Sequence, residues 1–235
     1  MAHYWATEVT FVTNQLGTQV HLRVWGDNAC FTRPEMKVER VSYDVMTPSA
    51  ARGVLDAILW KPAIRWIVTR IDVLKPIRKA SVRRNEVSDV VPVNSVRTAM
   101  NKGGQLALYI EDKRQQRAGL FLRDVDYLIQ ARFELTAKAG PEDNLRKFAE
   151  MFRRRAEKGQ CFNQPYLGCR EFSAAFAWGD PAENLLTPIA ETRDLGWMLQ
   201  DIDYSGDEPM PRFFRATLDN GSVHVPPLAS EEVMG

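Results

Sequence analysis

Positive charge is concentrated in one short stretch of the sequence, residues 139–159. Its cations are Arg146, Lys147, Arg153, Arg154, Arg155 and Lys158. Because the formal net charge of the whole chain is only +1, this excess is local. A local excess of cations attracts a phosphate backbone and predicts nucleic-acid binding. The alternative is a solvated helix face, balanced by Glu142, Asp143, Glu150 and Glu157.

The same stretch has the pattern of an amphipathic helix. Pro141 suits a first-turn position, and Gly159 suits a left-handed stop. Apolar residues recur at helical spacing, which predicts a buried stripe made of Leu145, Phe148, Ala149, Phe152 and Ala156. The cations must then lie on the remaining faces.

A strand expected at residues 20–25 brings further chemically active groups. Its apolar positions alternate with His21, Arg23 and Trp25, the pattern of a half-buried strand. An exposed face with an imidazole, a guanidinium and an indole would stack on or pair with nucleotides. The alternative is a second packed layer that simply covers Trp25.

Residues 32–47 interleave basic and aromatic side chains. Arg33, Lys37 and Arg40 surround Tyr43 in a loop or hairpin, which is a plausible RNA contact. Basic residues recur in two later segments, as Arg83 and Arg84 and then as Arg114 and Arg117.

The composition argues against metal, membrane and secretion. The cysteines Cys30, Cys161 and Cys169 match no zinc spacing, and with only three histidines we expect no metal and no other cofactor. An odd number of cysteines without a paired framework fits a reducing cytoplasm. No apolar run approaches the ~20 residues that span a bilayer, and residues 1–18 do not resemble a secretory signal, so we expect no membrane contact.

The elements that must position these groups follow an alternating order. Thr47 and Pro48 are expected to open a helix that ends before Pro62. The expected strands are residues 20–25, 64–74, 105–110, 125–135, an extended piece at 166–178, and tail strands at 197–204, 213–218 and 223–225. Residues 85–104 are expected to be a loop with one helical turn, and Asp219-Asn220-Gly221 a hairpin turn.

This order predicts an α+β fold. Its core is a ferredoxin-like (RRM-like) βαββαβ domain with helices on one face of an antiparallel sheet. We expect an N-terminal extension at residues 1–18, the core domain at 19–180 with an insertion at about 76–123, and a small C-terminal antiparallel β-sheet at 181–235. The fold hosts many unrelated functions and does not decide among them.

Several longer motifs resemble one known family. They are Gly26 to Pro34, Val41 to Gly53, Trp60-Lys61-Pro62, Arg83 to Val87, Arg114 to Arg117, Pro165 to Phe172 and Arg193 to Gly196. Together they look like the fifth CRISPR-associated (Cas) family in its subtype I-C (Dvulg) form, part of the repeat-associated RNA-binding superfamily. The resemblance covers roughly residues 19 to 225.

The resemblance implies a metal-independent endoribonuclease. Such a protein cuts precursor CRISPR RNA within each repeat, retains the 5′ handle and remains a subunit of the type I-C surveillance complex. The family's catalytic set has an aromatic residue or histidine before Trp-Lys-Pro and a Lys-His pair in the second helix. This sequence has Leu59 and Lys147-Phe148 at those positions, so only the lysine is kept.

Metal-independent cleavage needs a base for the 2′-hydroxyl, a cation for the developing phosphorane charge and an acid for the 5′ oxygen. Lys147 can supply the cation, or the base if its pKa is lowered, and Tyr43 or His21 are candidates to replace the missing groups. The expected RNA-binding residues are Arg33, Lys37, Arg40, Lys61, Arg83, Arg84, Arg114, Arg117, Arg146, Arg153, Arg154 and Arg155.

Two other interpretations stay open. In one, the chain is a non-catalytic subunit that holds the 5′ handle while another nuclease cuts, because both interpretations use the same cations. In the other, the basic residues bind duplex DNA, since phosphate contacts are largely independent of sequence.

Overall fold

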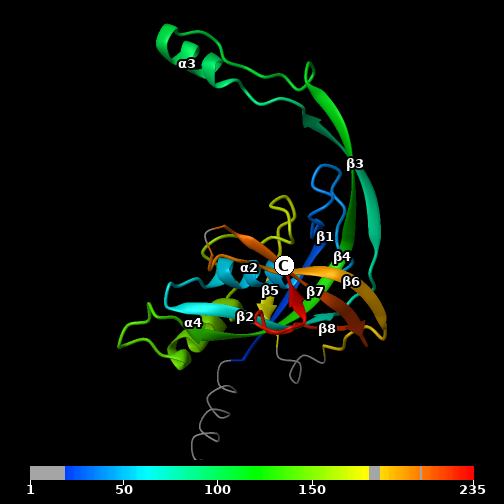
Figure 1. The fold of residues 1–235 in the computed structure, drawn as a ribbon, viewed down its shortest axis with the longest axis vertical. Coiled ribbons are helices and arrows are strands. Elements are labelled where there is room, and N and C mark those ends of the chain that lie inside the picture. Colours follow the sequence, from blue (N-terminus) through cyan, green and yellow to red (C-terminus); the bar gives the residue numbers. More distant parts are fainter. Residues whose placement is uncertain (1–18, 180–185, 207) are drawn as a thin grey trace, which may run out of the picture.

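The computed structural model describes residues 19–179, 186–206 and 208–235, so the expected N-terminal extension lies outside the described residues (Figure 1). The central strands are antiparallel neighbours in the order β5-β1-β4-β2. They are β1 (Val20–Ala29), β2 (Ile64–Val73), β4 (Arg114–Leu135) and β5 (Ala175–Trp178). With helix α2 after β1 and helix α4 after β4, the chain has the predicted βαββαβ order, and the α+β class is confirmed.

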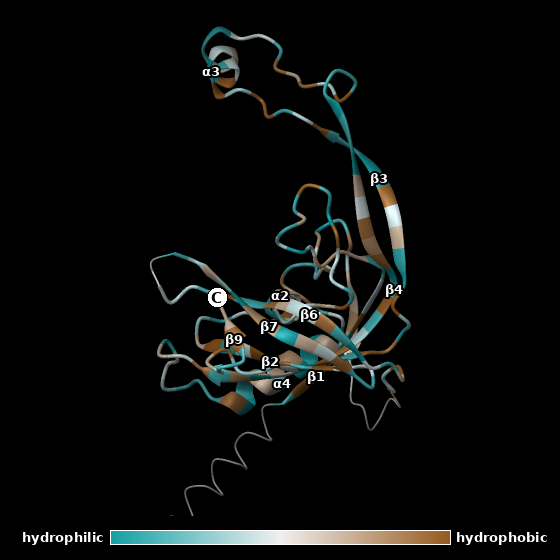
Figure 2. Ribbon diagram, turned by 45° about the vertical axis from the view of Figure 1, so that its right-hand side comes forward, coloured by the Kyte–Doolittle hydropathy of each residue, from teal (hydrophilic) through white to brown (hydrophobic). Residues whose placement is uncertain are grey.

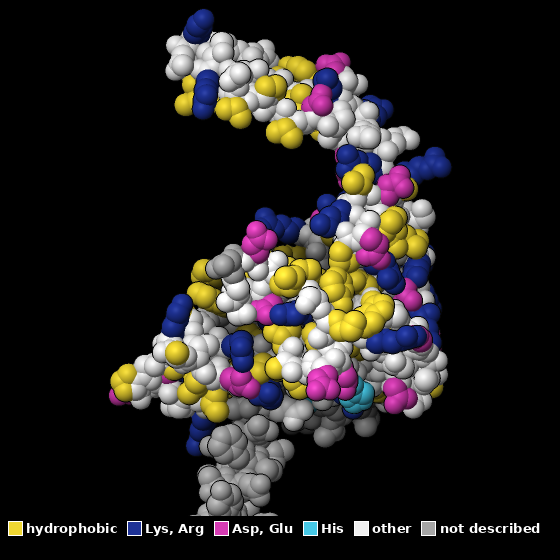
Figure 3. Space-filling view, in the orientation of Figure 1, with side chains coloured by type: hydrophobic (Ala, Val, Ile, Leu, Met, Phe, Trp, Pro, Cys, Tyr) yellow, Lys and Arg dark blue, Asp and Glu magenta, His cyan; other side chains and the backbone are white. Residues whose placement is uncertain are grey.

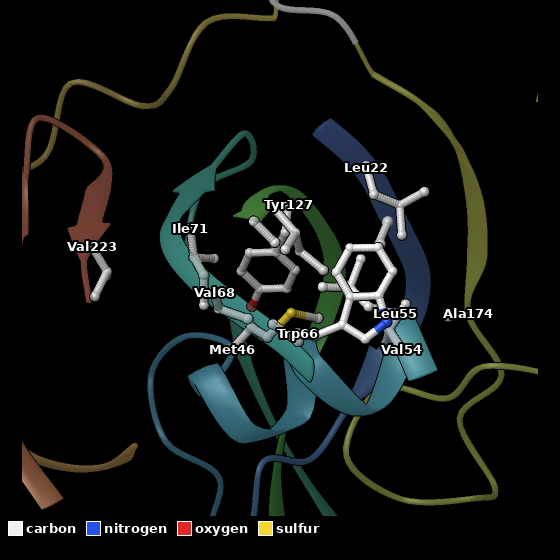
Figure 4. Packing of buried hydrophobic residues seen from close by; sticks show 14 of the residues in the cluster. Leu22, Met46, Val54, Leu55, Trp66, Val68, Ile71, Tyr127, Ala174 and Val223 are labelled. Carbon is white, nitrogen blue, oxygen red and sulfur yellow. The ribbon is translucent and has the colours of Figure 1, made fainter. Parts of the chain in front are cut away.

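Helix α2 (Pro48–Ile58) begins as its sequence predicts. Thr47 is the N-cap, and its hydroxyl accepts a hydrogen bond from the Ala50 N–H at 3.3 Å. The buried side of the helix packs against β2, and Figure 4 shows Val54 and Leu55 close to Trp66 and Leu22 in this core. Helix α2 also contacts strand β6 (Arg193–Asp203), where Arg52 pairs with Asp201.

Helix α4 (Leu145–Glu157) starts later than expected. Asn144 is the N-cap, with its side-chain oxygen accepting from the Lys147 N–H at 2.9 Å, and Pro141 lies in the turn before the helix. The helix begins after Asn144 rather than at Pro141, because the Asn144 side chain satisfies a free N–H of the first turn. Gly159 ends the helix at φ +62°, as predicted. The buried stripe is confirmed by Phe148, Phe152 and Ala156.

A long hairpin replaces the expected loop and short strand at residues 85–110. Strand β3 (Lys79–Val87) pairs with the first part of β4, from Lys79↔Leu122 to Val87↔Arg114. Helix α3 (Val93–Lys102) follows at the tip, and none of its residues is buried. We call residues 79–122 the arm, which extends away from the body in Figure 1 and carries hydrophobic segments at its tip in Figure 2. Residues 105–110 are exposed or half-buried and form no strand, because no neighbouring strand pairs with them.

The C-terminal antiparallel strands are present, and they continue the main sheet. They are β6 (Arg193–Asp203), β7 (Met210–Asp219), β8 (Ser222–His224) and β9 (Val233–Met234). Strand β8 pairs with β2, which gives the sheet order β5-β1-β4-β2-β8-β7-β6. The expected turn is confirmed, because Asn220 and Gly221 adopt φ of 46° and 77° between β7 and β8. Within the described residues, no helix is long and apolar enough to cross a membrane.

Candidate nucleic-acid interface

The two positions that depart from the family's catalytic pattern are both buried. Leu59 is fully buried at the end of α2, and its carbonyl accepts a hydrogen bond from Trp66 Nε1 at 2.9 Å. Phe148 is 3% exposed and packs edge-on against Phe133, with ring centroids 6.5 Å apart. Their side chains are apolar and enclosed, so neither can exchange a proton with RNA.

Lys147 lies beside them on the outer surface of α4. Its side chain is 45% exposed, and Nζ lies 3.1 Å from Asp143 Oδ1. A hydrogen bond from the Gly140 N–H and one from Lys147 lower the pKa of Asp143, and the charge of Lys61 contributes in the same direction. Lys61 is exposed, and its charge acts on the same carboxylate, although 86 positions separate the two lysines in the sequence (147 − 61). A phosphate that approaches Lys147 would compete with Asp143 for its ammonium group.

Tyr43 lies at the opposite end of α2. It is 2% exposed, and Arg33 covers its ring with Cζ 4.5 Å from the centroid. Burial raises the pKa of Tyr43, while a hydrogen bond with the backbone of Leu199 acts against this rise. Since α2 has 11 residues, its length of about 16 Å separates Tyr43 from the Lys61 end. The structure does not bring Tyr43 and Lys147 together.

His21 lies on the face of β1 that points away from the helices. Val20, Leu22 and Val24 are buried under α4 and α2, and His21, Arg23 and Trp25 alternate with them, which confirms the half-buried strand. Arg23 forms two hydrogen bonds to the buried Asp126, at 3.0 and 2.7 Å. His21 and Lys147 are therefore on opposite sides of the sheet.

The cations at the base of the arm form a network with two glutamates. Glu171 receives Arg40 at 3.1 Å and Arg84 at 2.9 Å, and Glu86 receives Arg84 at 2.9 Å and Arg117 at 3.4 Å. These arginines are partly neutralised. Figure 3 accordingly shows basic and acidic side chains mixed over the visible face, without a uniform basic patch.

Several other predicted RNA-binding residues are exposed to solvent. Lys37, Arg83 and Arg114 are exposed and have no ion pair with another described residue. On α4, Arg154 is also exposed, whereas Arg146 pairs with Glu150. Arg153 pairs with Glu157 and lies over Trp178, and Arg155 donates to the Ile58 carbonyl. The solvated-face interpretation thus describes part of this helix.

Two exposed aromatic residues near the end of α2 were not singled out from the sequence. Trp60 is 62% exposed and Phe162 is 82% exposed. The N–H groups of Phe162 and Asn163 donate to the Ala57 carbonyl at 2.9 and 3.1 Å, which holds this loop at the end of α2. Exposed rings beside cations suit stacked bases. Trp60 belongs to the Trp60-Lys61-Pro62 motif, whereas the one sequence signal for Phe162 is its position shortly after the basic helix.

A separate groove of about 770 Å³ is less suited to phosphate. It lies between α2, β2, β4, β6 and the residues after β8. Arg52 forms two hydrogen bonds to Asp201, at 2.6 and 2.7 Å, and the other arginines in the groove are likewise engaged with Glu134 and Asp203. Its cations already have carboxylate partners.

A family model described as CRISPR-associated protein (Cas_Cas5), Cas_Cas5d, matches residues 20–226. The chain belongs to the Cas5d family. A protein of Mannheimia succiniciproducens named CRISPR pre-crRNA endoribonuclease Cas5d is 55% identical over 224 residues, which cover 93% of this chain and 99% of that protein. A protein of the same name from Thermus thermophilus is 40% identical over 226 residues, covering 88% and 91%.

Solved structures share the fold of this Cas5d chain. A crystal structure described as a CRISPR-associated protein has a TM-score of 0.66 at 22% identity, covering 92% of this chain and 96% of the other. A functionally uncharacterised protein of Streptococcus mutans has a TM-score of 0.65 at 21% identity, covering 92% and 97%. At this identity the likeness concerns the fold alone.

Proposed function

We propose that this Cas5d chain is an endoribonuclease that cuts precursor CRISPR RNA in the repeat, keeps the 5′ handle and serves as a subunit of the type I-C surveillance complex. The observation that carries the proposal is the 55% identity to a protein named CRISPR pre-crRNA endoribonuclease, over 99% of that protein. Lys147 adds a local reason, since it is exposed at a family position and the charge of Lys61 acts on the same carboxylate. We place this activity in the cytoplasm.

The proposed reaction is attack by a 2′-hydroxyl on the adjacent phosphorus, with departure of the 5′ oxygen. Lys147 stabilises the charge that develops on the phosphorane, and Lys61 supplies a second cation. Asp143 orients the Lys147 ammonium through their 3.1 Å contact. The lysines supply the charge stabilisation, and we expect cleavage without added metal.

Leu59 and Phe148 limit the rate in this proposal. A general acid or base contributes typically ~10²–10⁴-fold, so their absence predicts slow cleavage. Tyr43 and His21 stay predictions for these roles, although the burial of Tyr43 and the position of His21 on the other sheet face argue against both. Tyr43→Phe and His21→Ala test them, because unchanged cleavage rates exclude each hydroxyl or imidazole.

The direct test is cleavage of the chain's own repeat RNA in EDTA. We expect one cut that leaves a 5′-hydroxyl, and at least a tenfold loss of rate in Lys147→Ala. Lys75→Ala is the matched control, since Lys75 is 41% exposed and pairs with Asp124 at 2.7 Å, much as Lys147 pairs with Asp143. Equal rates for Lys147→Ala and wild type contradict the assigned role of Lys147.

A non-catalytic RNA-binding subunit is the second candidate, and the buried apolar Leu59 and Phe148 favour it. Tight binding of the repeat RNA with no cut, in EDTA or with added Mg²⁺, would establish this function.

Duplex DNA binding is the third candidate. Equal affinity for a scrambled duplex DNA and the repeat hairpin would support it, because phosphate contacts alone carry no sequence information.

A further inference from the structure

Cys30 and Cys169 lie together in a small buried cluster at the base of the arm. Cys30 follows β1 and is fully buried, and Cys169 lies in the loop before β5 and is 8% exposed. Phe121 of β4 and Phe172 complete the cluster. Cys161 is outside it, so the sequence's odd number of thiols contains one spatial pair.

Backbone and side-chain contacts hold the two thiols against each other. The Cys30 N–H donates to the Leu167 carbonyl at 3.0 Å, and the Cys169 thiol donates to the Cys30 carbonyl at 3.5 Å. The Thr32 hydroxyl contacts both sulfur atoms, at 3.5 and 4.0 Å, which places the two thiols side by side. Gly168, at φ +82°, makes this approach possible, because a Cβ there would lie 2.1 Å from the Cys30 carbonyl oxygen.

The surroundings of the two sulfur atoms differ. Arg40 lies with one guanidinium nitrogen 3.2 Å from Cys169 Sγ. The hydrogen bond from Cys30 and the charge of Arg40 lower the pKa of Cys169, whereas the contact with Cys169 and burial raise the pKa of Cys30. The cation next to Cys169 Sγ therefore favours the thiolate at Cys169 over Cys30.

We propose that Cys30 and Cys169 form an oxidative modification site that reacts with hydrogen peroxide and closes to a disulfide. The Cys169 thiolate attacks a peroxide oxygen, the O–O bond breaks, and the departing hydroxide takes up the proton that Cys169 had lost. The Cys30 sulfur then attacks the resulting sulfenic acid, the S–O bond breaks, and water leaves with the Cys30 proton. The two thiols lose two electrons and two protons in total, and the peroxide becomes two water molecules.

The disulfide would join the end of β1 to the loop whose Glu171 binds two cations of the arm base. Glu171, two residues after Cys169, holds both Arg40 and Arg84. Closing the bond fixes this loop to the end of β1 and takes the Cys169 thiol away from Arg40, while Glu171 remains its ion-pair partner. The modification therefore acts on a surface that also includes predicted RNA contacts.

The test is peptide mapping of the full chain. The reduced protein, freed of reductant, is treated with hydrogen peroxide near equimolar amounts, alkylated under native conditions and digested without reduction. We expect a Cys30–Cys169 linked peptide pair that disappears on reduction, with Cys161 alkylated. Cys161→Ser should give the same linked pair. A link that includes Cys161, or Cys30 and Cys169 both still alkylatable after denaturation, overturns the proposal.

A variant separates the two chemical steps. In Cys30→Ala the resolving thiol is absent, so we expect Cys169 to accumulate as sulfenic acid that dimedone traps. Cys169→Ala should instead leave Cys30 unmodified under the same conditions. Trapping at Cys30 in that variant, or none at Cys169 in Cys30→Ala, contradicts the assigned order. Because the wild-type mapping stands alone, the site remains testable if either variant fails to fold.

Discussion

Trp60 and Phe162 expose large rings at the end of α2, and we expect both to stack on bases of the repeat RNA. Truncating a stacking ring costs about 1–3 kcal/mol per base, so Trp60→Ala and Phe162→Ala should each weaken RNA binding by roughly five- to a hundredfold. Fluorescence anisotropy with labelled repeat RNA measures this. Tyr204→Ala is the control, because Tyr204 is 67% exposed but follows β6 beside the separate groove. Losses no larger than that of the control would exclude stacking.

Asp143 holds Lys147 in an ion pair, and Asp143→Asn should release that lysine. The folded-state pKa of this carboxyl is lowered by the Gly140 N–H and Lys147, so its interactions are present above the unfolded pKa and are lost only as pH falls through the lower folded value. Mild acid therefore does not remove the charge, whereas substitution does. We expect Asp143→Asn to bind repeat RNA more tightly, and unchanged or weaker binding at neutral pH would contradict this. Asp124→Asn, beside Lys75, is the matched control.

The sequence predicts the positions of some site residues and not of others. Lys147 could be predicted because it sits in a basic helix and at a family position. The position of Tyr43 could not, since a tyrosine among basic residues fits a surface loop as well as a buried ring covered by Arg33. The sequence also does not reveal the surroundings of Cys169, because its neighbours Arg40 and Cys30 are 129 and 139 positions away.

At the scale of elements, the arm tip should be dispensable for folding. Helix α3 contributes no buried residue, and Ser88 and Lys113 already face each other through an N–H to carbonyl bond of 2.9 Å. Replacing residues 89–112 with Asn-Gly, which favours a two-residue hairpin turn, should therefore leave the thermal unfolding midpoint within about 2 °C of wild type. Differential scanning calorimetry measures this. A drop of more than 5 °C would mean that the tip stabilises the body.

The arm also shows why the sequence did not predict the boundaries of its strands. Strand β3 is exposed or half-buried at every position, so it lacks the alternation that predicts a half-buried strand. The first part of β4 is likewise mostly exposed, and only the part inside the body alternates as expected. Asp124, at φ 52°, lies where β4 passes from the body to the arm. Helices α2 and α4 and the body strands, by contrast, carry buried faces that their sequences already display.

At the scale of the whole molecule, the charge distribution separates two kinds of cation. Many cations are ion-paired with carboxylates. Others are exposed and available to phosphate, including Lys37, Arg83 and Arg114. Binding to phosphate releases counterions, and each single-strand phosphate contact contributes about −0.7 to the slope of log K against log salt. Cations that already have protein partners release fewer counterions. The salt slope should therefore depend on the available cations rather than on net charge.

We expect each of Lys37→Ala, Arg83→Ala and Arg114→Ala to reduce the magnitude of that slope for repeat RNA by about 0.7, and the triple variant by about 2. Titrations between roughly 50 and 200 mM salt measure it. Arg215 of β7 carries an equal charge that is paired with Asp194 of β6, so Arg215→Gln should leave the slope unchanged. If Arg215→Gln lowers the slope as much as Arg83→Ala, binding responds to net charge, and the assignment of individual phosphate contacts fails. A slope that falls only in the arm and loop variants places the RNA backbone along the arm and the 32–47 loop.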